Sequence, residues 1–207
     1  IKFNEIKQLA ETKDINKSQH EFKVKEFIKL REIISDENKS FYLALHLKSL
    51  HVFAMKIFNK KDELTKEAKH EIDFVKNYSH RCITHFYGFI KDDKTGKIIG
   101  LIFEFMSNGS LRPNVYSNPE KINEVFVLNT IIRILLGIDY LHSNKLMHRD
   151  LKPSNILIDH DFLPYISDFE TILSIEDEDA NFTDDIGSPL YTSPEQERGE
   201  RLTSATD

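Results

Sequence analysis

The chain has 207 residues, of which 40% are hydrophobic and 30% charged, and it carries a net charge of −6 at pH 7. This length and composition suit one large globular domain or two small ones. The acidic balance argues against a nucleic-acid partner, because non-specific nucleic-acid binding depends on neutralising phosphates with Lys and Arg. The single cysteine, Cys82, excludes an internal disulfide framework and a Cys-rich zinc site.

Membrane and secretion signals are absent from the pattern. No apolar run approaches the roughly 20 residues that a membrane-spanning helix requires. The longest run, residues 98–103, is short enough for a buried strand. Because the chain begins without Met and without an apolar leader, we expect no secretory signal. These features predict an intracellular, cytoplasmic protein without a membrane segment, and they leave the oligomeric state open.

The first part of the chain changes character after residue 26. Residues 1–26 are polar and highly charged, and we interpret them as an N-terminal extension whose role stays open. The next three runs, at 27–34, 41–47 and 49–58, are rich in apolar and aromatic residues and are separated by short polar turns. They predict three successive antiparallel strands, with alternate residues of the third facing opposite sides.

A helix is predicted over residues 59–80, and Glu71 lies beside its apolar stripe. An acid near a buried face needs a partner. Two further strands are predicted at 82–90 and 98–106, so the first half is a small sheet with one helix. The apolar residues that define the helix recur at the spacing of one helical face: Leu64, Ala68, Ile72 and Val75.

The second half has a helical pattern. Residues 121–144 form a long amphipathic segment that predicts a helix. Residues 145–170 predict two short units of strand and loop. Residues 170–188 are acidic and polar without an apolar period, and we expect a mobile loop there.

The most specific segment is HRDLKPSN, residues 148–155. It brings an acid, Asp150, a cation, Lys152, and an amide, Asn155, into one short loop between apolar runs. A second acid, Asp168, follows the next apolar run. Two acids and an amide suit a divalent cation and an oxyanion substrate. An isolated Asp-x-x-x-x-Asn more often forms a turn that its own side chains stabilise, so the pattern alone leaves both interpretations open.

The string HRDLKPSN followed by SDFE resembles the catalytic loop and metal-binding segment of protein kinases. Other kinase-like elements follow in the same order: AMK at 54–56, Glu71, FEFMSNGSL at 103–111 and GSPLYTSPE at 187–195. The resemblance implies an α+β, protein-kinase-like bilobal fold. Its N-lobe would be an antiparallel sheet with one helix, followed by the first part of a mainly helical C-lobe.

The same resemblance implies the domain boundaries. A partial kinase domain would cover residues 27–207, with the N-lobe at about 27–106 and an incomplete C-lobe at about 107–207. The final Asp207 resembles the residue that opens the central C-lobe helix. We therefore expect a truncated domain that is poorly stable or misfolded as it stands.

The roles of the polar residues in the catalytic loop are implied by the resemblance. Asp150 would be the catalytic base that orients the substrate hydroxyl, and Lys152 would contact the transferred phosphate. Asn155 and Asp168 would hold Mg²⁺. The Lys-Pro-Ser after Asp150 is the form found in serine/threonine kinases, and EFMSNGSL resembles the tyrosine-kinase-like branch.

The ATP-binding residues are implied in the same way. Lys56 would bind the α- and β-phosphates, and an ion pair with Glu71 would position it. Phe103 would form the back of the adenine pocket. The remaining nucleotide contacts would come from Phe41, Ala54, Glu104, Met106 and Leu157.

The implied function is transfer of the ATP γ-phosphate to a protein serine or threonine, with ATP and a protein substrate as partners and Mg²⁺ as cofactor. Arg149 implies an activation loop that phosphorylation can order, with Ser174, Thr183 and Ser188 as candidate sites. Two alternatives stay open. One is a pseudokinase or scaffold with weak nucleotide binding, and the other is an inactive truncated fragment.

Two departures from the kinase pattern affect the phosphate site. The stretch 34–39 stands where kinases have a glycine-rich loop, and it contains no glycine. Glycine allows the backbone to approach phosphates without a Cβ. Asp36 and Glu37 would add negative charge near the triphosphate, and Lys39 would partly compensate. Glu170 replaces the glycine that follows Asp168-Phe169, which adds charge near the metal site.

These departures predict weak binding of ATP. A calorimetric titration of the purified protein with ATP should give a dissociation constant well above that of kinases with an intact glycine-rich loop. Tight binding, comparable to that of such kinases, would contradict this prediction.

Overall fold

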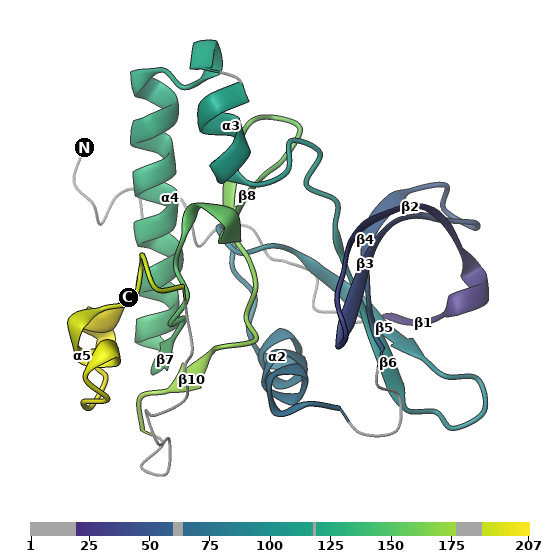
Figure 1. The fold of residues 1–207 in the computed structure, drawn as a ribbon. Helices are drawn as coiled ribbons and strands as arrows, with labels where there is room; N and C mark the ends of the chain where they lie inside the picture. Colours follow the sequence, from purple (N-terminus) through teal and green to yellow (C-terminus); the bar gives the residue numbers. More distant parts are fainter. Residues whose placement is uncertain (1–19, 60–63, 118, 177–187) are drawn as a thin grey trace.

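The computed structural model describes residues 20–59, 64–117, 119–176 and 188–207. Figure 1 shows a strongly curved sheet with helix α2 on one side of the molecule and a part built around the long helix α4 on the other. The sheet has the strand order β1-β5-β6-β4-β3-β2. Its strands are β1 (His20–Lys23), β2 (Phe27–Ser35), β3 (Lys39–His46), β4 (Val52–Phe58), β5 (Phe86–Lys91) and β6 (Ile98–Glu104).

The three predicted antiparallel strands are confirmed as β2, β3 and β4. The alternation predicted for β4 is also present. Phe53 and Met55 belong to one apolar cluster, whereas Ala54 and Phe58 pack in the cluster that includes α2. In β4, Lys56 lies opposite Phe41 of β3, so the two strands bring a cation and an aromatic ring to the same position of the sheet.

The sheet begins before the predicted boundary at residue 26. Strand β1 runs parallel to β5, with His20 opposite Gly88, and the 3₁₀ turn Val24–Glu26 leads into β2. Three of the four residues of β1 are exposed, so no hydrophobic alternation in the sequence marks this strand. Gly88 permits the close approach, because a Cβ at that position would lie 2.0 Å from the carbonyl oxygen of His20.

Helix α2 spans Lys66–Asn77 and lies against the sheet, shorter than the predicted segment. The side chain of Thr65 caps it by accepting a hydrogen bond from the backbone of Ala68. The predicted stripe is confirmed in the buried Ala68, Ile72 and Val75. The helix also buries Glu71, so the acid noted beside the stripe faces the interior.

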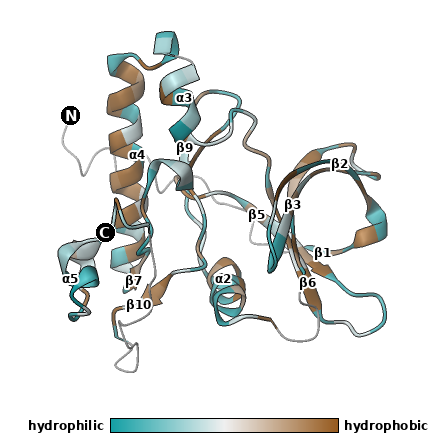
Figure 2. Ribbon diagram, viewed as in Figure 1, coloured by the Kyte–Doolittle hydropathy of each residue, from teal (hydrophilic) through white to brown (hydrophobic). Residues whose placement is uncertain are grey.

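Helix α4 (Glu124–Ser143) follows the short helix α3 (Leu111–Ser117) and confirms the predicted long helix. Its buried Arg133 donates hydrogen bonds to the carbonyl oxygens of Pro164 and Arg81. Figure 2 shows apolar residues along much of its length. By length and composition α4 could cross a membrane, but core helices of folded proteins share that property, so this is weak evidence for a span.

Two small sheets support the segment after α4. Strand β7 (Leu146–Met147) pairs with β10 (Leu173–Ser174), and β8 (Ile156–Ile158) pairs with β9 (Pro164–Ile166). Short helical turns complete this part: η2 (Pro119–Lys121), η3 (Pro153–Asn155), α5 (Pro194–Glu197) and η4 (Ser204–Thr206). Most of the predicted mobile loop, residues 177–187, lies outside the described residues.

One apolar cluster joins the two parts of the molecule. It contains residues of α2, the sheet, α4 and β9. At its centre the rings of Phe74, from α2, and Phe169, which follows β9, are stacked with centroids 4.3 Å apart. Cys82 is buried as well, as expected for a packing residue.

The contact between β1 and β5 predicts the effect of a methyl group at Gly88. Gly88→Ala should displace β1 and destabilise the protein by about 1–3 kcal/mol, because the added Cβ overlaps backbone atoms. Hydrogen exchange should show loss of amide protection over residues 20–23. Gly96→Ala is the control, since no atom lies within 4 Å of its Cβ and the added strain is confined to a backbone with φ of +68°. Protection of β1 that survives Gly88→Ala would contradict this account.

Candidate active site

The loop at 148–155 runs between β7 and β8, close to the segment that follows β9. Arg149 in this loop and Asp168 in the segment after β9 have unusual backbone angles, with φ of 68° and 67°. Non-glycine residues rarely adopt positive φ, and where they do the surrounding structure must hold them.

Asp150 is fixed through one of its two carboxylate oxygens. Its Oδ2 accepts hydrogen bonds from Lys152 Nζ at 2.6 Å and from Asn155 Nδ2 at 2.9 Å. Its Oδ1 is buried and has no hydrogen-bond partner among the described residues. Lys152 Nζ also donates to Ser188 Oγ at 2.7 Å, which places Ser188 beside Lys152. Asp150 thus presents one acceptor oxygen in a fixed orientation.

Asn155 and Asp168 lie on the wall of one cavity. The amide nitrogen of Asn155 donates to Asp150, which directs its amide oxygen the other way. Ser167, next to Asp168, donates two hydrogen bonds to the carbonyl oxygen of Asn155 and so ties the two segments together. Amide and carboxylate oxygens are the ligands that Mg²⁺ prefers. The donor set therefore fits a magnesium ion.

His148 is fully buried and packs edge-on against Phe169. Its Nδ1 accepts from the backbone N–H of Asp150 at 3.3 Å, so Nε2 carries the proton and donates to the carbonyl oxygen of Ser167 at 3.1 Å. Burial lowers the pKa of His148, although the carboxylates of Asp207, Asp168 and Asp150 oppose this shift. The neutral ring therefore links the loop at 148–155 to the segment that carries Asp168.

Asp207 holds the strained backbone of the loop. Its carboxylate accepts the N–H groups of His148 and Arg149, each at 2.8 Å, and the ring Nε2 of His142 at 2.9 Å. These contacts were missed from the sequence, where Asp207 was noted only for its resemblance to a helix-opening residue. Nothing in the sequence around Asp207 marks its side chain as buried, and Arg198 and Arg201 precede it closely.

A cavity of about 350 Å³ lies between the sheet and the β8–β9 unit, within the range of small-molecule sites. Phe103 contributes to its wall from β6, and the segment after β6 forms one side. The structure brings eight of the predicted site residues to this wall: Phe41, Ala54, Glu71, Glu104, Met106, Asn155, Leu157 and Asp168.

Lys56 is fully buried and forms ion pairs with two carboxylates. One is Glu71 on α2, as the resemblance implies, and the other is Glu170, whose Oε1 lies 2.5 Å from Lys56 Nζ. Burial would lower the pKa of Lys56, but these two carboxylates outweigh it and raise the pKa. Burial raises the pKa of Glu71. The negative charges of Glu170 and Asp168 raise it further, and the positive charge of Lys56 offsets only part of this rise.

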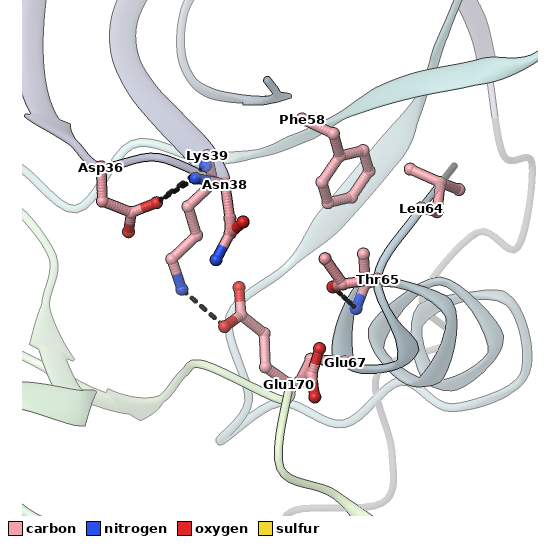
Figure 3. A pocket seen from close by; sticks show the side chains of 9 residues that line it. Asp36, Asn38, Lys39, Phe58, Leu64, Thr65, Glu67 and Glu170 are labelled. Atoms are coloured by element: carbon pink, nitrogen blue, oxygen red, sulfur yellow. Dashed lines mark hydrogen bonds and ion pairs between the residues drawn. The ribbon is translucent and has the colours of Figure 1, made fainter. Parts of the chain in front are cut away.

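The turn at 34–39, which stands in place of the glycine-rich loop, is stabilised by hydrogen bonds to the side chain of Asp36. Asp36 Oδ1 accepts the backbone N–H groups of Asn38 and Lys39, both at 2.8 Å. Burial opposes ionisation of Asp36, but these two N–H groups prevail and lower its pKa. The expected negative charge of Asp36 is therefore engaged within the turn (Figure 3).

Glu170 occupies a position that the sequence did not reveal. Its Oε2 lies 2.6 Å from Nζ of Lys39, while its Oε1 contacts Lys56 (Figure 3 shows the Lys39 contact). Burial opposes ionisation of Glu170, but Lys56 and Lys39 together lower its pKa. Lys39 does compensate a negative charge, as expected, but that charge belongs to Glu170.

The candidate phosphorylation sites differ in their surroundings. Ser174 lies in β10 opposite Leu146, Ser188 contacts Lys152, and Thr183 lies outside the described residues. The guanidinium of Arg149, expected to capture a phosphate, donates through Nε to the carbonyl oxygen of Thr171 at 2.6 Å.

Comparison with known proteins gives one family. The family model described as the protein kinase domain matches residues 7–207. An Aurora kinase of Debaryomyces hansenii is 33% identical over 132 residues, which cover 62% of this chain and 31% of the relative. MAP3K epsilon protein kinase 1 of Arabidopsis thaliana is 32% identical over 66% of this chain and 10% of the relative. The mitogen-activated protein kinase kinase mkk2 of Aspergillus fumigatus is 34% identical over 75% of this chain and 32% of the relative.

The chain spans about a third or less of the length of these relatives. The match of the family model begins at residue 7, ahead of the boundary predicted at residue 26. The similar proteins do not distinguish the tyrosine-kinase-like branch, which stays a prediction.

The buried neutral ring of His148 predicts a pH dependence of stability. Its pKa is lowered in the folded protein from an ordinary value of 6.5. The unfolded chain therefore binds the proton more readily than the folded protein. The contribution of His148 to the free energy of unfolding should be fully present above about pH 6.5 and should be lost as the pH falls below that value. The slope contributed by one proton is at most about 1.4 kcal/mol per pH unit.

Urea unfolding of the protein between pH 5 and 8 measures this slope. His148→Gln should flatten it, whereas His160→Gln, at an exposed histidine, should leave it unchanged. The partly buried His85, whose pKa is also lowered by burial, contributes equally to all three proteins. An unaltered slope in folded His148→Gln would refute the assignment.

Proposed function

Because this chain belongs to the protein kinase domain family, we propose that it carries the phosphoryl-transfer site of a protein serine/threonine kinase. The reaction transfers the γ-phosphate of ATP to a hydroxyl group of a protein substrate. Relatives named as Aurora, MAP3K epsilon and mkk2 kinases support this class. The intracellular location stays a prediction, in keeping with ATP as the substrate.

The observation that carries the proposal is the free carboxylate oxygen of Asp150. A buried acceptor without a partner costs roughly 1–3 kcal/mol, so such an atom in a folded protein calls for an explanation. Oδ1 is buried in this way, while Oδ2 is held by Lys152 and Asn155. A substrate hydroxyl would supply the missing donor, and Asp150 would orient it for in-line attack and accept its proton.

The other proposed roles follow from position. Lys152, which contacts both Asp150 and Ser188, would bind the phosphate as it is transferred. Asn155 and Asp168 would hold Mg²⁺, which neutralises charge on the phosphates when it is bound. Phosphoryl transfer needs little covalent chemistry from the protein, so positioning and charge account for most of the catalysis.

The nucleotide would occupy the cavity between the sheet and β8. Phe41 and Ala54 would cover the adenine from the sheet, and Leu157 would support it from β8. The backbone of Glu104 and Met106 would bond to its edge. Lys56, held by Glu71, would contact the α- and β-phosphates.

The relatives do not favour the second candidate, a pseudokinase or scaffold that binds nucleotide weakly, but two features of the site bear on it. Lys56 is enclosed by two carboxylates, and the turn at 34–39 engages its own N–H groups through Asp36. Both features oppose phosphate binding. The two candidates share the fold and the cavity and differ in turnover.

A phosphotransfer assay on the protein distinguishes them. With radiolabelled ATP, Mg²⁺ and casein as a generic substrate, Asp150→Asn should lower the rate by about 10²–10⁴-fold, the usual contribution of a positioned proton acceptor. ATP binding should persist in this variant, because Asp150 does not line the nucleotide cavity.

Asp161→Asn is the matched control, since Asp161 is an exposed acid in the turn between β8 and β9, and it should leave the rate unchanged. Equal background signal from the wild type and Asp150→Asn would reject catalysis and leave the scaffold candidate.

A further inference from the structure

Four charged side chains alternate in sign beside the nucleotide cavity. Lys39 contacts Glu170 at 2.6 Å, Glu170 contacts Lys56 at 2.5 Å, and Lys56 contacts Glu71. Lys39 and Glu170 stand where the kinase pattern has glycines. The resemblance to kinases therefore assigns a role to neither side chain. Glu170 is the shared partner, because its two carboxylate oxygens bind two different lysines.

The position of Lys39 links it to the nucleotide. Lys39 lines the 350 Å³ cavity and also an adjoining cavity of about 170 Å³, which Glu170 lines as well. Figure 3 shows the Lys39 side chain extending from the turn toward Glu170. Lys39 is 22% exposed and Glu170 20%, so both can exchange partners without unfolding the core.

The carboxylate of Glu170 has the chemistry of a phosphate oxygen pair. Both are anionic acceptors that form short, charge-assisted hydrogen bonds with ammonium groups. In the nearby turn a carboxylate also stands where a phosphate could bind, because Asp36 accepts hydrogen bonds from the N–H groups of Asn38 and Lys39. Successive N–H groups in a turn form a natural anion site. Two carboxylates of this chain, Glu170 and Asp36, therefore accept hydrogen bonds from the donor groups that would otherwise suit a triphosphate.

We propose that Lys39 is a second phosphate-binding cation beside Lys56, and that nucleotide phosphates displace Glu170 from both lysines. The inference rests on the proposed function, because it takes ATP as the ligand of the cavity. It assigns Lys39 a binding role and makes Glu170 an internal competitor of the triphosphate.

The exchange has a measurable consequence. In the wild type each contact between a lysine and a phosphate replaces a contact with Glu170, so the phosphates add little to affinity. Without the Glu170 charge, Lys39 would have lost its carboxylate partner and Lys56 would retain Glu71 alone. The phosphates would then gain both contacts, while the adenosine moiety, bound elsewhere in the cavity, would be unaffected.

Calorimetric titration with ATP and with adenosine tests this consequence on the folded protein. Glu170→Gln should tighten ATP binding by about tenfold, as one recovered charge-assisted contact would, and should change adenosine affinity by less than about twofold. Glu170→Gly, which restores the residue of the kinase pattern, should act in the same direction. In the Glu170→Gln protein, adding Lys39→Met should weaken ATP by about tenfold and leave adenosine unchanged.

Two matched controls are available. Glu67→Gln removes a carboxylate that lines the same 170 Å³ cavity, and Lys69→Met removes an exposed lysine of α2. Neither should alter the ratio of ATP to adenosine affinity. Circular dichroism spectra establish that each variant is folded.

The outcomes separate this inference from the proposed function. If adenosine binds but both Glu170 variants keep the wild-type affinity for ATP, the inference is wrong and the nucleotide site stands. Equal tightening of ATP and adenosine would also overturn it, because the effect would then be on the cavity and not on the phosphates. If neither ligand binds to any folded variant, the proposed function and this inference both fail.

Discussion

The buried ammonium group of Lys56 is the constraint on which the site depends. A charge removed from water is strongly destabilising unless partners surround it. Its partners come from separate parts of the chain, Glu71 on α2 and Glu170 after β9, so one side chain fixes the helix and the segment after β9 against the sheet. The stacked rings of Phe74 and Phe169 lie on the same two segments and add apolar contact to the electrostatic link. Placement of α2 and placement of Asp168 are therefore coupled.

Local patterns predicted much of the fold. The strands β2, β3 and β4 come from three short apolar and aromatic runs separated by polar turns, and the stripe of α2 repeats at helical spacing, so both signals lie within short windows. The loop at 148–155 is equally local, because Asp150, Lys152 and Asn155 meet through hydrogen bonds across only a few residues. Glu71 was found since a lone acid beside an apolar stripe demands a partner, and the kinase-like AMK segment supplied Lys56.

The features that the sequence did not predict depend on distant contacts or lack a pattern. Glu170 and Lys39 are 131 positions apart, and nothing in either segment indicates the other. Strand β1 has one partly buried residue among exposed ones, so its pairing with β5 depends on the space that Gly88 leaves. The role of Asp36 depends on the backbone of the turn. Its carboxylate accepts hydrogen bonds from two N–H groups of that turn, whereas the sequence suggested that its charge would face the triphosphate.

The contacts of Asp207 have a consequence for the order of events during synthesis. Its carboxylate binds the backbone of His148 and Arg149, which precede it by 59 and 58 positions. While the ribosome adds those residues, the emerging loop lacks the acceptor that holds its positive φ. The sheet, by contrast, is complete once β6 has left the exit tunnel, and domains generally fold as their residues become available. The sheet can therefore form first, and the loop at 148–155 takes its final shape only after Asp207 has been added.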